Sequence, residues 1–209
     1  MALVLGSICC PRNQASGSGG SALGGLNVPE VQLSVTLPVT YRSQEGYHNC
    51  WAACAEMVFD YLGAGRLRQC EQAGVGISDP DCCTDGLLDA GSQCDYQWHP
   101  EFQTWGFDVN IAPSPSHALN HLRWEEVKAE INAGRPFMFC WVESSQLNHL
   151  LVCVGYDESK PGESALIYYD PLAQNTQEAI MTRRKDYEGT SGYYLSQFSF
   201  YRIRPRSLK

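Results

Sequence analysis

Residues 50–62 read CWAACAEMVFDYL, and this stretch has the pattern of an amphipathic helix. Its apolar residues recur at helical spacing and form one stripe: Trp51, Cys54, Val58, Tyr61 and Leu62. The alanine, glutamate and methionine residues between them are good helix formers. Asn49 is the predicted N-cap, and Gly63 is the predicted residue after the C-cap. The pattern therefore predicts a helix over residues 50–62 with one face turned to the core.

The predicted helix begins at Cys50, and this position suits a reactive thiolate. The first turn of a helix has backbone N–H groups without partners, and it carries the positive end of the helix dipole, so both features favour an anion. Cys54 lies one turn later and is expected to face the core. Cys50 is therefore the candidate nucleophile, and Cys54 is a candidate buried thiol.

After this helix, the sequence predicts one more helix and then a series of extended runs. A second helix is predicted over residues 124–133, and short apolar or aromatic runs separated by polar turns follow it. These runs are PFMFCWV (136–142), HLLVCVGY (149–156), ALIYYD (165–170) and GYYLSQFSFYRI (192–203). Upstream, VQLSVTLPV (31–39) alternates as a half-buried strand does. Helices followed by antiparallel strands indicate the α+β class.

Three polar residues are candidates to complete a site around Cys50. His149 begins one predicted strand, and Asp170 ends the next, where its carboxylate would be able to orient the imidazole. Gln44 lies in a polar loop six residues before Cys50 and offers an amide N–H2 as an oxyanion donor. A thiol, a base and an oxyanion donor are the groups that nucleophilic catalysis by cysteine needs.

Several short motifs together resemble those of papain-like cysteine peptidases. QEGYHNCWAACAEM (44–57) resembles the nucleophile segment, NHLLVCVGYD (148–157) resembles the histidine strand, and YYDP (168–171) resembles the third-residue segment. The third residue is Asn in plant and lysosomal members and often Asp in bacterial relatives. The resemblance covers roughly residues 36–202.

The spacings from Cys50 are 149 − 50 = 99 residues to His149 and 170 − 50 = 120 residues to Asp170. They are shorter than the 130–150 residues that separate the papain and cathepsin residues, and HNCW replaces the usual lead-in to the cysteine. The chain therefore resembles the compact bacterial members, which are bacteriocin-processing or double-glycine-peptidase-like and related to secreted effector proteases.

The resemblance implies a papain-like α+β fold, in which an N-terminal helix carrying the nucleophile packs against an antiparallel sheet. It implies Cys50 as nucleophile, His149 as general base and then acid, and Asp170 as the residue that orients His149. Gln44 and the backbone N–H of Cys50 would form the oxyanion hole. The implied reaction is cleavage of an amide bond through an acyl-enzyme intermediate.

Two other functions use the same residues or the same fold. A transglutaminase-like acyltransferase or deamidase would use the same cysteine, histidine and aspartate on glutamine side chains. A binding module that has lost the chemistry would keep only the fold, but the intact set of four residues argues against it. His48 lies two residues before Cys50 and is a weaker candidate base than His149. Substrate-binding residues are not assigned by the sequence.

Ten cysteines occur in the 209 residues, and they divide by context. One Gly/Asp/Ser-rich segment holds four of them: Cys70, Cys82, Cys83 and Cys94. Two local disulfides are favoured there over a zinc site, because zinc ligands rarely have these spacings and a pair of adjacent ligands fits a tetrahedral ion poorly. Three pairings remain open. Cys140 and Cys153 lie in apolar runs and are expected to be buried thiols.

Charge and hydropathy restrict the partners. The chain has 15 basic against 23 acidic residues, a net charge of −8, and no basic cluster that would suit nucleic acid. It has no apolar run of about 18 residues, so we expect no transmembrane segment. His117 and His121 have helical metal-ligand spacing but no further ligand beside them, so we expect no metal and no cofactor. The expected partner is a protein or peptide substrate, and we expect a monomer.

The N-terminal residues differ in composition from the rest. Residues 11–26 are rich in glycine and serine, so residues 1–27 are interpreted as a leader or disordered segment and residues 28–209 as the peptidase domain. MALVLGSICC, at the start, has no basic region and no clear cleavage site. The compartment stays open, with secretion or export favoured over the cytoplasm because of the cysteine-rich segment alone.

Overall fold

An antiparallel sheet occupies the C-terminal half of the chain, as the extended runs predict. The chain divides into two units, Met1–Val31 and Gln32–Lys209. The computed structural model describes residues 32–84, 91–114, 118–142, 148–173, 179–189 and 195–207 of the second unit. The predicted leader, residues 1–27, and His117 lie outside the described residues.

Within the described part of the chain, seven strands form one sheet. They are β1 (Ser34–Thr36), β2 (Phe107–Ala112), β3 (Phe137–Val142), β4 (Asn148–Asp157), β5 (Ala165–Tyr169), β6 (Ile180–Arg183) and β7 (Leu195–Pro205). Their order is β2-β7-β3-β4-β5-β6 with β1 paired to β4, and all pairings are antiparallel. The α+β prediction is confirmed. β2 and β6 are strands that the sequence pattern did not predict.

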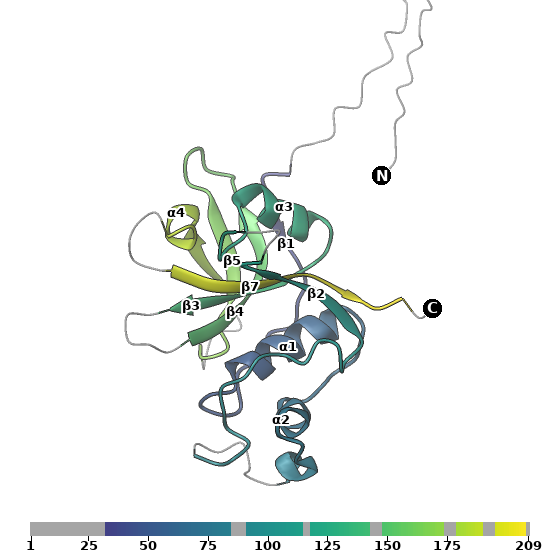
Figure 1. Cartoon of the computed structure of the whole chain (residues 1–209). Helices are drawn as coiled ribbons and strands as arrows, with labels where there is room; N and C mark the ends of the chain where they lie inside the picture. Colours follow the sequence, from purple (N-terminus) through teal and green to yellow (C-terminus); the bar gives the residue numbers. More distant parts are fainter. Residues whose placement is uncertain are drawn as a thin grey trace, which may run out of the picture. The chain divides into compact units, whose positions relative to one another are not determined.

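The helices pack around this sheet. They are α1 (Cys50–Tyr61), α2 (Gln69–Ile77), α3 (Trp124–Asn132) and α4 (Arg184–Tyr187), with a 3-10 turn η1 (Pro80–Cys83) after α2. In Figure 1, α1 and α2 lie below the sheet, and α3 and α4 lie above it. None of the described helices is long and apolar enough to cross a membrane.

Helix α1 begins at Cys50, as predicted, and contacts β4. Every residue from Cys50 to Phe59 is buried, so the helix is covered on more than the one predicted stripe. The Cys54 thiol donates a hydrogen bond to the Leu150 carbonyl of β4 at 3.1 Å and joins the helix to the sheet. Asn49 takes the N-cap position, but its side chain does not cap the helix; it donates to the Cys94 carbonyl at 3.3 Å.

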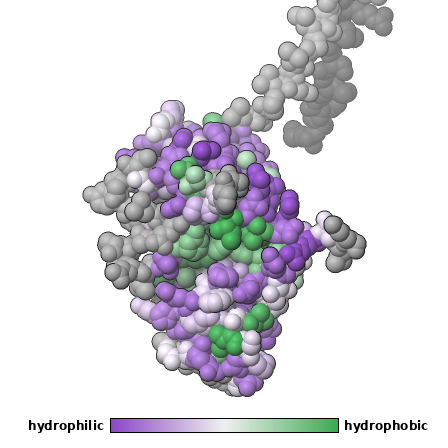
Figure 2. Space-filling view, in the orientation of Figure 1, coloured by the Kyte–Doolittle hydropathy of each residue, from purple (hydrophilic) through white to green (hydrophobic). Residues whose placement is uncertain are grey.

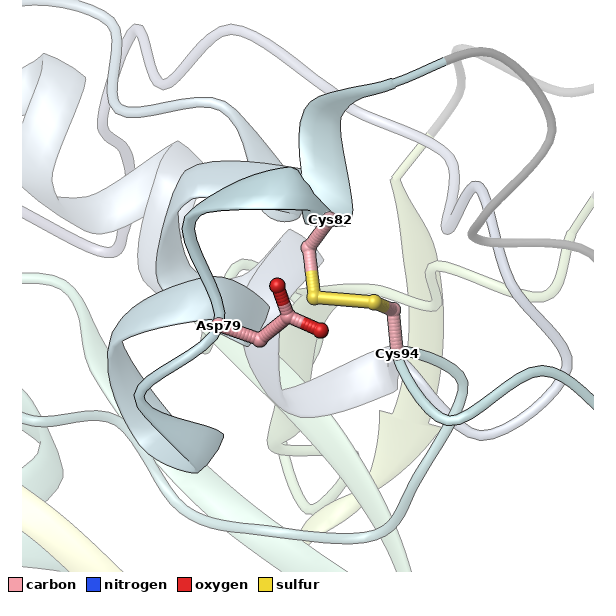
Figure 3. A group of neighbouring side chains, drawn as sticks. All are labelled: Asp79, Cys82 and Cys94. Carbon is pink, nitrogen blue, oxygen red and sulfur yellow. A yellow bond between two sulfur atoms is a disulfide. The ribbon is translucent and has the colours of Figure 1, made fainter.

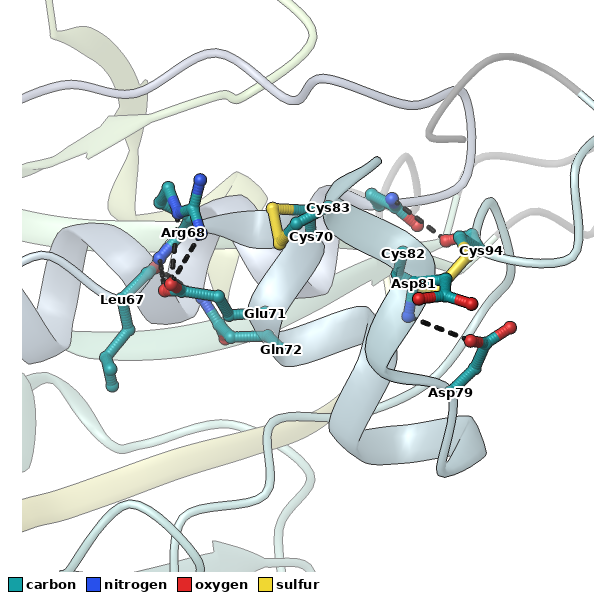
Figure 4. Close-up of a disulfide and its surroundings, with 11 residues drawn as sticks. Leu67, Arg68, Cys70, Glu71, Gln72, Asp79, Asp81, Cys82, Cys83 and Cys94 are labelled. Carbon is teal, nitrogen blue, oxygen red and sulfur yellow. Dashed lines mark hydrogen bonds and ion pairs between the residues drawn. A yellow bond between two sulfur atoms is a disulfide. The ribbon is translucent and has the colours of Figure 1, made fainter. Parts of the chain in front are cut away.

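Helix α1 is covered by the sheet and also by a segment that two disulfides close, Cys70–Cys83 and Cys82–Cys94. We call residues 69–84 and 91–96 the stapled segment (Figure 4). The prediction of two local disulfides is confirmed, and the structure selects one pairing out of three. Helix α2 within this segment was not predicted. Figure 2 shows an apolar patch over α2, where the side chains of Val75 and Ile77 are 39% and 37% exposed.

A buried carboxylate joins α1 to the stapled segment. Glu56 of α1 is fully buried, and its Oε1 accepts from Arg66 Nε at 2.7 Å. Its Oε2 accepts from Gln69 Nε2 of α2 at 3.1 Å. A buried charge needs such partners, because leaving water is costly for an ion. Glu56 therefore fixes the position of α2 on the helix that carries Cys50.

Replacing Glu56 by alanine is expected to lower the free energy of unfolding by about 2–3 kcal/mol, because two hydrogen bonds to a buried charge are lost. Urea denaturation would measure this change. Glu125→Ala is the matched control: Glu125 is exposed and pairs with Lys128 on the surface, where an ion pair contributes about 1 kcal/mol or less. Equal losses in the two variants would contradict the structural role of Glu56.

Candidate active site

The start of β4 and the end of β5 bring His149 and Asp170 together. Val152 of β4 pairs with Tyr169 of β5, so the residue after β5 lies beside the first residues of β4. His149 Nε2 lies 2.6 Å from Asp170 Oδ1. Asp170 Oδ1 also accepts from the Leu172 N–H at 2.8 Å, which holds the carboxylate in place.

The Cys50 side chain lies close enough to the His149 ring to raise its pKa. Since Nε2 is bonded to Asp170, Nδ1 is the ring nitrogen that remains for the thiol. Burial lowers the pKa of His149, but the hydrogen bonds and charges of Asp170 and Cys50 outweigh it and raise that pKa to about 9. In the same pair, burial raises the pKa of Asp170, but the bond and charge of His149 prevail and lower it. The shifts of His149 and Asp170 therefore favour an imidazolium ring paired with a carboxylate.

The other free thiols of the described part of the chain are different from Cys50 in environment. Burial, then the nearby Cys50 and Asp170, raises the pKa of Cys54 well above its usual value. Burial is also the main cause that raises the pKa of Cys140 to about 12 and that of Cys153 upward. These thiols stay protonated near neutral pH and are buried, as predicted. Of the four free thiols in the described residues, Cys50 is the one that raises the pKa of an imidazole.

Gln44 lies in a loop that is bonded to the turn carrying Asp170. The Gln44 N–H donates to the Pro171 carbonyl at 2.9 Å. Its side-chain Nε2 donates to the carbonyls of Gly46 and Tyr47, both at 2.7 Å, and its Oε1 is buried without a partner among the described residues. The structure thus brings Gln44 near the turn after β5 but shows its amide N–H2 engaged within its own loop.

The stapled segment holds this loop from the other side. The Gln69 side chain of α2 donates from Nε2 to the Ser43 carbonyl and accepts at Oε1 from the Glu45 N–H, each at 2.8 Å. These two bonds bracket Gln44 on both sides along the backbone. Helix α2 therefore positions the predicted oxyanion donor, a role that no local sequence signal indicates.

A second histidine–aspartate pair lies at the start of α1. Asp95 is buried, and its Oδ1 accepts from the His48 N–H at 2.6 Å, while its Oδ2 lies 3.2 Å from His48 Nδ1. His48 and Cys50 line the same cavity of about 260 Å³. The remaining lining is largely aromatic and apolar with two amides and a further histidine: Trp51, Gln97, Trp98, His99, Cys140, Asn148, Leu150, Phe198 and Phe200. The sequence identified His48 as a weaker candidate base but gave no sign of its partner Asp95.

Three successive residues of the stapled segment bond to the start of α1. The Cys94 carbonyl accepts from the Asn49 side chain, the Asp95 carboxylate binds His48, and the Tyr96 carbonyl accepts from Trp51 Nε1 at 2.9 Å. Residues on both sides of Cys50 are therefore held by one short stretch. That stretch follows directly on the Cys82–Cys94 disulfide.

Asp79, Cys82 and Cys94 form the one group of potential metal ligands found in the described part of the chain (Figure 3). The two sulfur atoms are bonded to each other, and Asp79 Oδ1 accepts from the Asp81 N–H at 2.9 Å. Disulfide sulfur is not a thiolate ligand, so this group does not suit zinc in its oxidised state.

An α+β fold with a helix-start cysteine close to a strand histidine is the arrangement expected of papain-like cysteine peptidases. The family model described as papain-like cysteine protease AvrRpt2 (Peptidase_C70) matches residues 31–188, and the chain belongs to this family. A comparison with curated proteins finds no match. The family assignment confirms the predicted hydrolase and, within the predicted resemblance, points to the effector proteases. It also implies a protein substrate.

Proposed function

We propose that the chain is an endopeptidase whose catalytic residues are Cys50, His149 and Asp170. The observation that carries the proposal is the His149 ring, which lies 2.6 Å from the Asp170 carboxylate and close enough to the Cys50 side chain for Cys50 to raise its pKa. A base that is oriented by a third group and lies within reach of a nucleophile is the arrangement that covalent catalysis needs.

In the proposed reaction, the proton of the Cys50 thiol resides on His149, and the thiolate attacks the scissile carbonyl carbon. The carbon–nitrogen bond breaks, the leaving amine takes the proton from His149, and the acyl group remains on Cys50 as a thioester. Water then gives a proton to His149 and attacks the thioester, which releases the acid and restores the thiol. Asp170 keeps the ring oriented and stabilises its positive form throughout.

The oxyanion of the tetrahedral intermediate would be bound at the start of α1. The Cys50 N–H lies in the first turn, where the N–H groups have no acceptor within the helix, and the helix dipole adds to its effect. We assign the second donor to Gln44, whose amide would exchange one of its bonds to Gly46 or Tyr47 for the oxyanion. A preorganised oxyanion donor contributes about 10²–10³-fold to the rate, and the bond that Gln44 gives up reduces this gain.

A mixed peptide library incubated with the chain and with Cys50→Ala tests the function. New N-termini formed only by the Cys50 protein would support a peptidase. Mass shifts without cleavage would instead indicate acyl transfer or deamidation, and an unchanged library would support a binding module.

Labelling with iodoacetamide followed by peptide mapping tests the nucleophile independently. Cys50 is expected to react first, with Cys54 as the internal control because its buried thiol has a raised pKa. Preferential labelling of Cys54 at mildly acidic pH would overturn the assignment of Cys50.

A further inference from the structure

We propose that His48, oriented by Asp95, is a specificity-determining residue that binds a basic side chain of the substrate in the cleft beside Cys50. This inference rests on the proposed function, because it assigns the substrate of the same site. The triad uses His149 and Asp170 and leaves the second histidine–aspartate pair without a role.

The hydrogen bonds to Asp95 show which ring nitrogen of His48 is left free for a ligand. Both oxygens of the Asp95 carboxylate are directed at His48, one at the backbone N–H and one at Nδ1. In the neutral ring, Nδ1 therefore carries the hydrogen, and Nε2 has the free lone pair. The His48 side chain is 36% exposed and Asp95 is fully buried, so the ring is the part of the pair that a substrate can reach.

The charge of the pair favours a cation. With the carboxylate ionised and the ring neutral, the pair has a net charge of −1 and its Nε2 is an acceptor, so it suits a cationic donor better than an anion. Neither lysine, arginine, aspartate nor glutamate is among the described residues that line the cavity. The surroundings are mostly apolar, where an interaction between charges is stronger than in water.

An exposed aromatic ring stands beside His48. Tyr47 is 62% exposed, and its ring centroid lies 4.8 Å from that of His48 in an edge-to-face arrangement. The Tyr47 ring is in contact with the His48 ring, so a lysine or arginine side chain bound at His48 would have an exposed aromatic ring nearby for a cation–π contact. The free lone pair at Nε2, the negative charge of the pair and the aromatic ring of Tyr47 all favour the same ligand, a basic side chain.

Peptide binding to the Cys50→Ala protein tests the inference without requiring cleavage. Fluorescent peptides of one length would carry lysine, norleucine or glutamate at each position in turn. At one position, lysine is expected to bind at least tenfold more tightly than norleucine, and glutamate more weakly than both. Adding His48→Leu is expected to abolish the lysine preference and leave the norleucine peptide within about twofold.

Asp95→Asn in the Cys50→Ala protein is expected to reduce the lysine preference by about threefold to tenfold, because the charge is removed while the size is kept. His99→Leu is the matched control, since His99 lines the same cavity but bonds only to the Pro100 carbonyl at 3.4 Å. It should keep the lysine preference.

Equal weakening of all three peptides by His48→Leu would overturn the inference and make His48 a structural residue. Absence of a lysine preference at every position in the Cys50→Ala protein would overturn it as well. A His48-dependent lysine preference in a chain that cleaves no peptide would instead uphold this inference and refute the proposed endopeptidase.

Discussion

Replacement of either Cys50 or His149 by alanine is expected to lower kcat/KM for peptide cleavage by about 10⁴-fold or more. Without the imidazole, the thiol loses the group that takes its proton, and without the thiol no acyl-enzyme forms. Because the two residues act as a unit, the double variant is expected to be no slower than the worse single variant. Initial rates with a peptide that the library identifies as a substrate would be measured for the wild type, both single variants and the double variant.

Two results would contradict the claim that Cys50 and His149 act as a unit. Additive losses would mean that Cys50 and His149 act in separate steps. A loss of less than about tenfold in His149→Ala would transfer the role of base to another residue, and His48→Ala in the same assay would then identify or exclude the second histidine. Circular dichroism of each variant would show that the fold is intact.

Asp170→Asn is expected to move the alkaline limb of the pH–rate profile to lower pH and to reduce kcat. The pKa of His149 is raised to about 9, so the imidazolium is lost as pH rises through about 9, and activity falls with it. Asp170 raises this pKa through its hydrogen bond and its charge, whereas burial lowers it. Removal of the carboxylate charge leaves burial opposed by Cys50 alone, so the pKa of His149 falls and the limb moves to lower pH.

Asp157→Asn is the matched control for this profile. Asp157 ends β4, while His149 lies near the start of that strand, and its carboxylate bonds to Ser159. It should leave the limb near pH 9. A limb that stays near pH 9 in Asp170→Asn as well would show that Asp170 does not tune the ring.

The same pKa shifts link stability to pH. The pKa of His149 is raised in the folded chain, so its contribution is fully present below about pH 6.5 and is lost as pH rises through about 9. The pKa of Asp170 is lowered, so its contribution is present above about pH 3.8 and is lost as pH falls further. The wild-type chain should therefore lose more stability than Asp170→Asn at both ends of this range.

Elements with a strong local pattern could be predicted from the sequence. Helix α1, helix α3 and strands β3, β4, β5 and β7 lie where the periodic runs indicate. Helix α2 could not be predicted, because Gly74 and Gly76 interrupt its pattern. The structure explains Gly74: a Cβ atom there would lie 2.5 Å from the Asp79 carbonyl oxygen, where the chain turns back into η1. A glycine that permits close packing is locally indistinguishable from a loop glycine.

Some residues of the candidate site could likewise be predicted from the sequence, and others could not. Cys50, His149, Asp170 and Gln44 could be named because each lies in a short motif at the edge of a predictable element. The pair of His48 and Asp95 could not, since the two residues are 47 positions apart and no element is common to them. Likewise, the bonds of Gln69 to the Gln44 loop depend on how α2 packs, and packing is set by contacts distant in sequence.

The position of the Cys82–Cys94 disulfide has a consequence for the conditions under which the chain can work. Residues 94–96 hold the start of α1, so the disulfide before them supports the nucleophile, while Cys50 itself must remain a free thiol. A strong reductant would open the support, and a strong oxidant would convert the thiol to higher oxidation states. Activity plotted against ambient redox potential should therefore pass through an optimum. At that optimum the Cys82–Cys94 pair is oxidised while Cys50 of the same chain is reduced.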